Sequence, residues 1–146
     1  MRKIYLASSW RNEGQPVLLD MLRCDGHEVY DFKNPRPNDK GFSWNKDSDG
    51  IENYNFLKAL DTENAKIHFG FDMEAMEWAD TFILYLPCGK SAHLETGWAI
   101  GKGKPTCIML PYRRTPDWEL MYLMADKIAG QWFDLKGWLD GLDVND

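Results

Sequence analysis

The chain has 146 residues, a length that fits one domain, residues 1–146, with a core of its own. Its net charge of −6 argues against a basic face for a nucleic acid polymer, but it does not exclude a small phosphorylated ligand. The three cysteines lack the spacing of metal ligands, which favours buried, reduced thiols and no metal site. No apolar run is long enough for a signal peptide or a membrane span, so we expect a cytoplasmic protein without membrane contact.

The first third of the chain predicts two strands around one helix. Ile4–Ala7 is a short apolar run typical of a strand. Pro16 then fits the first turn of a helix, whose apolar stripe runs over Val17–Leu22 and ends at Asp25–Gly26. His27–Phe32 predicts the second strand.

The rest of the chain begins with a predicted long loop at residues 33–50, of a kind that often forms a functional lid. Helices are predicted at Ile51–Leu60 and Thr62–Trp78, the latter with a break near Gly70. The apolar run Thr81–Leu86 predicts a strand buried on both faces. The remaining predicted elements are a helix at Ser91–Lys102, a strand at Thr106–Leu110, a helix at Pro116–Lys127, a strand at Gln131–Phe133 and a helix at Leu135–Leu142.

This alternation of strands and helices predicts an α/β fold. We expect a flavodoxin-like or Rossmann-like doubly wound sheet of about five mainly parallel strands, with helices on both faces. In such sheets ligands bind beyond the carboxyl ends of the strands, where the strand order reverses. The loops at residues 8–14 and 87–90 follow the first and third predicted strands, so we expect the site between them.

Glu95 is the strongest candidate for chemistry. It lies one turn into the predicted helix after the third strand, and helical side chains lean toward the N-terminus, so its carboxylate should reach this crevice. The helix N-terminus should keep it ionised. Such a carboxylate can attack or shield the anomeric carbon of a sugar; the alternative is a solvated surface glutamate. The small neighbours that would permit close approach of helix, sheet and ligand are Ala92, Gly97, Ala99 and Gly101.

Tyr5, Asp72 and the segment Pro87–Pro105 (Pro-Cys-Gly-Lys-Ser-Ala-His-Leu-Glu-Thr-Gly-Trp-Ala-Ile-Gly-Lys-Gly-Lys-Pro) together resemble the nucleoside 2-deoxyribosyltransferase family, including its deoxynucleotide N-glycosidase branch. The resemblance runs from Lys3 to about Asp126 and is dense between Asp72 and Pro105. It implies an enzyme without a cofactor. Such an enzyme cleaves the N-glycosidic bond of a small-molecule 2′-deoxynucleoside or its 5′-monophosphate and passes the sugar to another nucleobase or to water.

The resemblance also implies roles for single residues. Glu95 matches the nucleophile, Tyr5 the tyrosine that orients it, and Asp72 the aspartate that handles protons at the departing base. Glu119 and Met121 lie in a stretch that, in the family, completes the site of a neighbouring subunit at the 5′ end of the sugar. A homo-oligomer, a dimer or larger, is therefore expected.

Trp10, close behind the first strand, is the best candidate to stack on a nucleobase, ahead of Phe42 and Trp44. His27 and His68 are most simply structural, and Arg113-Arg114 is most simply a solvated turn. Outside the resemblance, Asp72 could instead cap the helix that leads to Trp78.

The chain departs from the family pattern before the glutamate. The family commonly has Gly-x-Gly-x-Glu where this chain has Ser-Ala-His-Leu-Glu, and Gly89 stands where transferases carry an aspartate. Ser91 either binds a phosphate or sugar oxygen or caps its helix, and His93 either binds the ligand or packs. Glu119 would repel a 5′-phosphate, whereas Lys90 and Ser91 would favour one, so the state of the 5′ group stays open.

Two other functions fit the sequence. The spacing Pro-x-Gly-x-Ser-x-x-x-Glu from Pro87 is similar to the Pro-Gly-Gly-x-Gly-Thr-x-x-Glu motif of phosphoribohydrolases that act on nucleoside 5′-monophosphates. The missing second glycine and the lack of a catalytic arginine at an obvious position count against that function. The other alternative is a non-catalytic module that binds a nucleotide without turning it over.

Overall fold

The computed structural model describes residues 1–44 and 55–145 of the chain. Its centre is one sheet with the strand order β2-β1-β3-β4-β5, in which every neighbouring pair is parallel. This order is that of flavodoxin-like proteins and confirms the predicted fold class. The strands are β1 (Lys3–Ala7), β2 (Glu28–Tyr30), β3 (Thr81–Tyr85), β4 (Thr106–Met109) and β5 (Lys127–Ala129).

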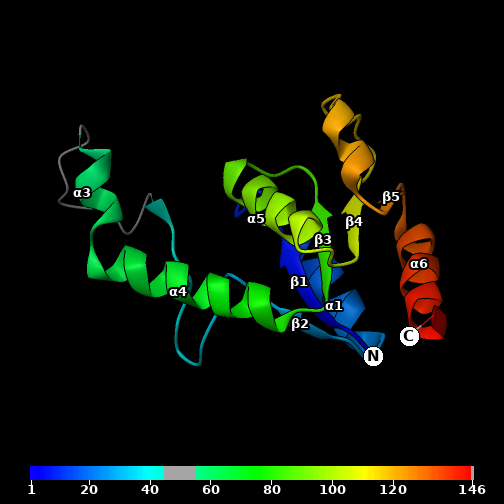
Figure 1. Ribbon diagram of the computed structural model, residues 1–146, viewed down its shortest axis with the longest axis horizontal. Coiled ribbons are helices and arrows are strands. Elements are labelled where there is room, and N and C mark those ends of the chain that lie inside the picture. Colours follow the sequence, from blue (N-terminus) through cyan, green and yellow to red (C-terminus); the bar gives the residue numbers. More distant parts are fainter. Residues whose placement is uncertain (45–54, 146) are drawn as a thin grey trace.

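Helices cover both faces of the sheet (Figure 1). On one face, α1 (Gln15–Cys24) and α6 (Trp132–Asn145) contribute Leu18, Leu22 and Leu135 to one core. On the other, α4 (Glu63–Trp78) and α5 (Lys90–Gly101) form a second core. Strand β3 is buried along its whole length, as its apolar run predicts, because its side chains alternate between the two cores.

The helix α4 runs without interruption, so the predicted break near Gly70 is wrong. A glycine inside a helix costs only about 1 kcal/mol relative to alanine. Here the Thr62 side chain caps the first turn by accepting a hydrogen bond from the Ala65 N–H. At the other end, the Lys104 ammonium donates to three backbone carbonyls at residues 76, 77 and 79. The short α3 (Phe56–Leu60) precedes α4, and both extend beyond the sheet in Figure 1.

The last third of the chain differs most from expectation. Residues 116–127 do not form an α-helix; they contain the 3₁₀ helix η1 (Leu120–Met124). The fifth strand lies at Lys127–Ala129 rather than at Gln131–Phe133, which hold the start of α6. Two hydrogen bonds between Asp126 and Thr106, one from each backbone N–H, draw this segment into register beside β4.

The other predicted elements lie within a few residues of their expected bounds. Strand β2 ends early because the Asp31 carboxylate accepts hydrogen bonds from the Lys33 N–H and the Asn34 side chain, which starts the loop. Residues 45–54, part of the predicted loop and of the helix at Ile51–Leu60, lie outside the described residues. Cys107 is buried as expected, whereas Cys24 is exposed. Among the described residues, no helix has the length and apolar character needed to cross a membrane.

Candidate active site

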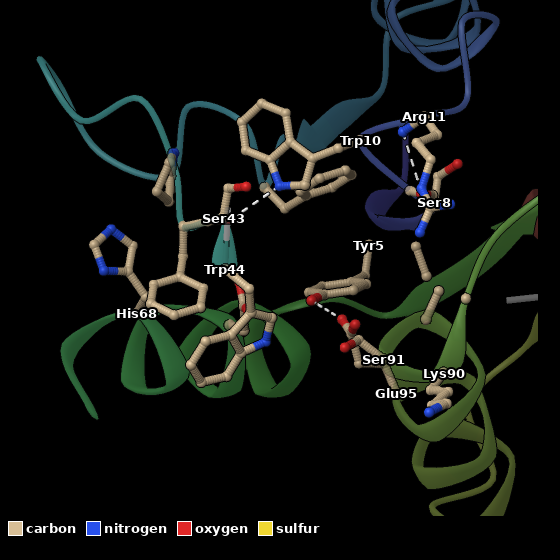
Figure 2. A pocket seen from close by; sticks show the side chains of 18 residues that line it. Tyr5, Ser8, Trp10, Arg11, Ser43, Trp44, His68, Lys90, Ser91 and Glu95 are labelled. Carbon is tan, nitrogen blue, oxygen red and sulfur yellow. Dashed lines mark hydrogen bonds between the residues drawn. The ribbon is translucent and has the colours of Figure 1, made fainter. Parts of the chain in front are cut away.

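A cavity of about 410 Å³ opens beyond the carboxyl ends of β1 and β3, where the strand order reverses (Figure 2). The loops after these two strands line it, as predicted, together with α4 and residues of the 32–44 segment. Ser8 and Asn12 tie the first loop in place, since both side chains donate hydrogen bonds to the Tyr85 carbonyl at the end of β3. The volume is within the range of pockets that hold small organic ligands.

Glu95 and Tyr5 meet inside this cavity. The Tyr5 hydroxyl donates a hydrogen bond to Oε2 of Glu95, as Figure 2 shows. Tyr5 itself is buried in the sheet, at the position of β1 that pairs with Tyr30 of β2 and Phe82 of β3. Its ring stacks on both neighbours, with centroid distances of 5.3 Å and 4.9 Å. The strand register therefore fixes where the hydroxyl points.

Asp72 lines the same cavity from α4, so the predicted convergence of Tyr5, Asp72 and Glu95 is confirmed. Because Asp72 lies inside α4 rather than at its start, the alternative of a helix cap is wrong. Sequence reasoning missed its partner: the Tyr30 hydroxyl donates a 2.8 Å hydrogen bond to Oδ1 of Asp72. A tyrosine at the end of the predicted second strand was the available signal.

Burial dominates the electrostatics of the two carboxyl groups. It raises the pKa of Glu95 to about 8, and the nearby charge of Asp72 adds to this, while the Tyr5 hydrogen bond opposes it. The expectation that Glu95 is ionised near neutral pH is therefore wrong. Its carboxyl group lies in the second turn of α5, where the helix end is too weak to outweigh burial.

Burial also raises the pKa of Asp72, and this rise is opposed by the Tyr30 hydrogen bond and by the charge of His68. Two interacting carboxyl groups titrate as a pair rather than singly. In the pH range between its two titrations, the pair of Glu95 and Asp72 therefore holds one proton. The pKa values of Tyr5 and Tyr30 are raised, first by burial and then by the neighbouring carboxylates, so both hydroxyls stay protonated donors.

One end of the cavity is cationic and rich in N–H donors. Gly89, Lys90 and Ser91 line it at the N-terminus of α5, and Arg11 approaches from the loop after β1 (Figure 2). Gly89 is the N-cap of this helix and Ser91 its second residue, so the alternative that Ser91 caps the helix is wrong. A helix N-terminus with free N–H groups and two cationic side chains nearby favours an anion.

The other end of the cavity is aromatic. Trp10, Phe42, Trp44 and His68 line it, and the Trp10 indole N–H donates a 2.8 Å hydrogen bond to the Phe42 carbonyl. Trp10 is 44% exposed, so the indole remains partly accessible. His68 is fixed as expected of a structural residue: its Nε2 lies 3.1 Å from the Asp39 carboxylate. These rings offer apolar faces to a flat heterocycle.

Three candidate residues lie outside this cavity. His93 makes contacts within the protein: its Nδ1 donates to the Gly89 carbonyl and its Nε2 lies 2.8 Å from the Tyr122 hydroxyl. Glu119 accepts a hydrogen bond from the Met121 N–H at the start of η1, and both residues are exposed. A single chain thus leaves Glu119 and Met121 away from its own cavity.

The small residues of α5 divide into two groups. Ala92 and Ala99 are buried against the sheet, whereas a side chain at Gly97 or Gly101 would meet open space. The close approach expected of all four therefore applies to the alanines alone. Within residues 1–44 and 55–145, no three His, Cys, Asp or Glu side chains form a group that could hold a metal ion.

The fold and the cavity define a flavodoxin-like α/β protein with a small-molecule-sized cavity at its topological switch point. The sequence matches no protein-family model and no curated protein. Solved structures with a similar fold include two nucleoside-processing enzymes. One is the 2-deoxyribosyltransferase of the psychrotolerant bacterium Bacillus psychrosaccharolyticus, with 22% identity and a TM-score of 0.57 over 91% of this chain and 89% of that one.

The other is the CMP N-glycosidase of Clostridium botulinum, with 17% identity and a TM-score of 0.53 over 94% of this chain and 97% of that one. At these identities the likeness establishes the fold alone. At the level of the fold, it confirms the resemblance drawn from the sequence.

Proposed function

We propose that this protein is an enzyme that cleaves the N-glycosidic bond of a 2′-deoxynucleoside 5′-monophosphate, with Glu95 as the nucleophile. The observation that carries the proposal is the meeting of two carboxyl groups, Glu95 and Asp72, in one cavity, each held by a tyrosine hydroxyl. A carboxylate nucleophile with a second carboxyl group as proton donor is a recurring solution to glycoside cleavage.

The shared proton gives the two carboxyl groups complementary tasks. An oxygen of Glu95 forms a bond to C1′ of the sugar while the bond from C1′ to the base nitrogen breaks and its electron pair goes to the base. The proton of the pair moves from Glu95 to Asp72, which leaves Glu95 ionised for the attack, and Asp72 gives it to the departing base. In the second half, water or another nucleobase attacks C1′, Glu95 leaves as a carboxylate, and the proton of the attacking group returns to the pair.

The two ends of the cavity supply binding. Lys90, Arg11 and the N–H groups of α5 favour a 5′-phosphate at one end, and Trp10 at the aromatic end offers a surface for the base. A neighbouring chain that brought Glu119 to this end would add one negative charge, which the two cationic side chains and the helix N-terminus outnumber. The cationic end therefore favours the monophosphate over the free nucleoside.

A second copy of the chain is the partner we propose for η1. The residues of this segment form an exposed apolar surface, and Trp118 next to it is 94% exposed. Large exposed apolar surfaces on soluble proteins mark interaction sites. Packing of this surface on another copy would carry Glu119 and Met121 toward the neighbour's cavity. The members of the surface are Trp118, Leu120, Met121, Leu123 and Met124.

A chromatographic screen of deoxynucleosides, their 5′-monophosphates and the matching ribonucleotides tests the proposal. At least one deoxynucleoside monophosphate should release its free base, and Glu95→Ala should abolish the release. Glu13→Ala removes an exposed glutamate outside the cavity and is the matched control. Adding a second free base distinguishes transfer from hydrolysis.

The outcomes separate the competing functions. Base release from AMP but not from dAMP would instead identify a phosphoribohydrolase. Tight binding of a monophosphate in calorimetry, with no base released by any substrate in the panel, would overturn the proposal in favour of a nucleotide-binding module.

A further inference from the structure

Tyr30, the last residue of β2, and Tyr5, in the middle of β1, form a matched pair. They are direct partners in the register of the two parallel strands, and their rings stack at 5.3 Å with an angle of 23° between the planes. Each hydroxyl donates to a different carboxyl group, Tyr5 to Glu95 and Tyr30 to Asp72. One stack of two rings thus holds carboxyl groups from two helices, Asp72 on α4 and Glu95 on α5.

We propose that Tyr30 is a positioning residue of the reaction. Its hydroxyl holds the Asp72 carboxyl group at the departing base while Tyr5 holds Glu95 at the sugar. This inference rests on the function proposed above. A half-buried side chain that faces a cavity can adopt several rotamers, and a hydrogen bond to a neighbouring side chain selects one. Within the described parts of the chain, the Tyr30 hydroxyl makes the one hydrogen bond to the Asp72 side chain.

The surroundings of Asp72 explain why a hydroxyl is needed there. Glu95 lies across the cavity, and His68 lies one turn earlier on α4. Behind Tyr30 is a second cavity of about 460 Å³, where the side chains of Arg36 and Glu74 form an ion pair. The hydrogen bond therefore links Asp72, which lines the catalytic cavity, to Tyr30, which lines the second cavity. Without it, Asp72 could turn away from the base.

Tyr30→Phe tests this role because it keeps the stacked ring and removes the hydroxyl. With the substrate that the wild type cleaves, we expect kcat to fall roughly 10- to 100-fold while KM changes less than about threefold. Tyr112→Phe removes the hydroxyl of an exposed tyrosine outside both cavities and is the matched control. An unchanged kcat in Tyr30→Phe would overturn the proposal.

The pH profile separates positioning from a general loss of structure. The acid limb of kcat/KM reports protonation of Asp72 when Glu95 already holds its proton. Because the Tyr30 bond lowers the pKa of Asp72, its loss should move this acid limb to higher pH. The Tyr112→Phe profile should match the wild type. An acid limb that stays in place in Tyr30→Phe would contradict the role of the hydroxyl.

A carboxyl ¹³C NMR titration decides the matter if the wild type cleaves none of the substrates. The Asp72 signal, assigned by its loss in Asp72→Asn, should titrate at higher pH in Tyr30→Phe than in the wild type. Unchanged titration would reject the Tyr30–Asp72 coupling itself. Shifted titration without base release would support the coupling and reject the reaction, so the two failures are distinguishable.

Discussion

Replacing Glu95 with glutamine should make the folded protein more stable than the wild type at pH 8, and nearly equal to it at pH 4. Burial raises the pKa of Glu95 from an ordinary value of 4.5 to about 8. The folded chain therefore keeps this proton up to pH 8, while the unfolded chain gives it up above pH 4.5. The stability from the neutral carboxyl group is complete below 4.5 and is lost as the pH rises toward 8.

The size of this stability difference follows from the gap between the two pKa values of Glu95, 4.5 in the unfolded chain and about 8 in the folded one. Each pKa unit corresponds to about 1.4 kcal/mol, so the wild type should lose about 3 to 4 kcal/mol relative to Glu95→Gln between pH 5 and pH 8. Glutamine is always neutral, and its amide oxygen can still accept the hydrogen bond of Tyr5. A difference of this size is a large part of the 5–15 kcal/mol that is roughly typical of domains.

Urea unfolding at pH 5 and pH 8, followed by the fluorescence of the seven tryptophans, measures the difference. The comparison of two proteins at each pH cancels the other titrating groups that they share. Glu13→Gln removes one exposed negative charge and controls for net charge. If Glu95→Gln exceeds the wild type by the same free energy at both pH values, the burial argument for Glu95 is refuted.

Three further predictions concern activity and assembly. Tyr5→Phe should move the alkaline limb of the pH–rate profile above pH 8, because the Tyr5 bond lowers the pKa of Glu95; an unmoved limb would contradict the pairing. Arg11→Ala and Lys90→Ala should each raise KM for the 5′-monophosphate about tenfold and leave KM for the free nucleoside unchanged, measured by base release. Leu123→Asp should shift sedimentation toward the monomer, and a wild-type species that is already monomeric would reject the proposed interface.

Much of the fold and part of the site follow from local sequence signals. The apolar run of β3 and the turn at Gly89 locate the carboxyl edge of the sheet, and Glu95 comes next in the chain. The family resemblance placed Tyr5 in the same site, and the topology agrees, because the carboxyl ends of neighbouring parallel strands lie at the same edge. Motif and topology lead to the same position, which is why this part of the prediction holds.

The features that sequence reasoning missed or predicted wrongly depend on contacts between distant segments. The partnership of Tyr30 with Asp72 requires the register of β1 and β2, which neither strand encodes alone. The position of β5 depends on Asp126 pairing with Thr106 rather than on the apolar residues around Gln131. The protonation of Glu95 depends on how deeply α5 sits on the sheet, and no spacing in the sequence reports that depth.

The burial of Glu95 both lowers the stability of the folded protein at high pH and keeps the proton that the proposed reaction needs. Ala92 and Ala99 let α5 lie close to the sheet, and this closeness brings the carboxyl group against the buried Tyr5. A carboxyl group held there keeps a proton at a pH where an exposed one has lost it, so the site stores the proton that a departing base needs. Glu95→Gln should thus be the more stable protein above pH 5 and the inactive one, which is the trade-off expected where stability is given up for chemistry.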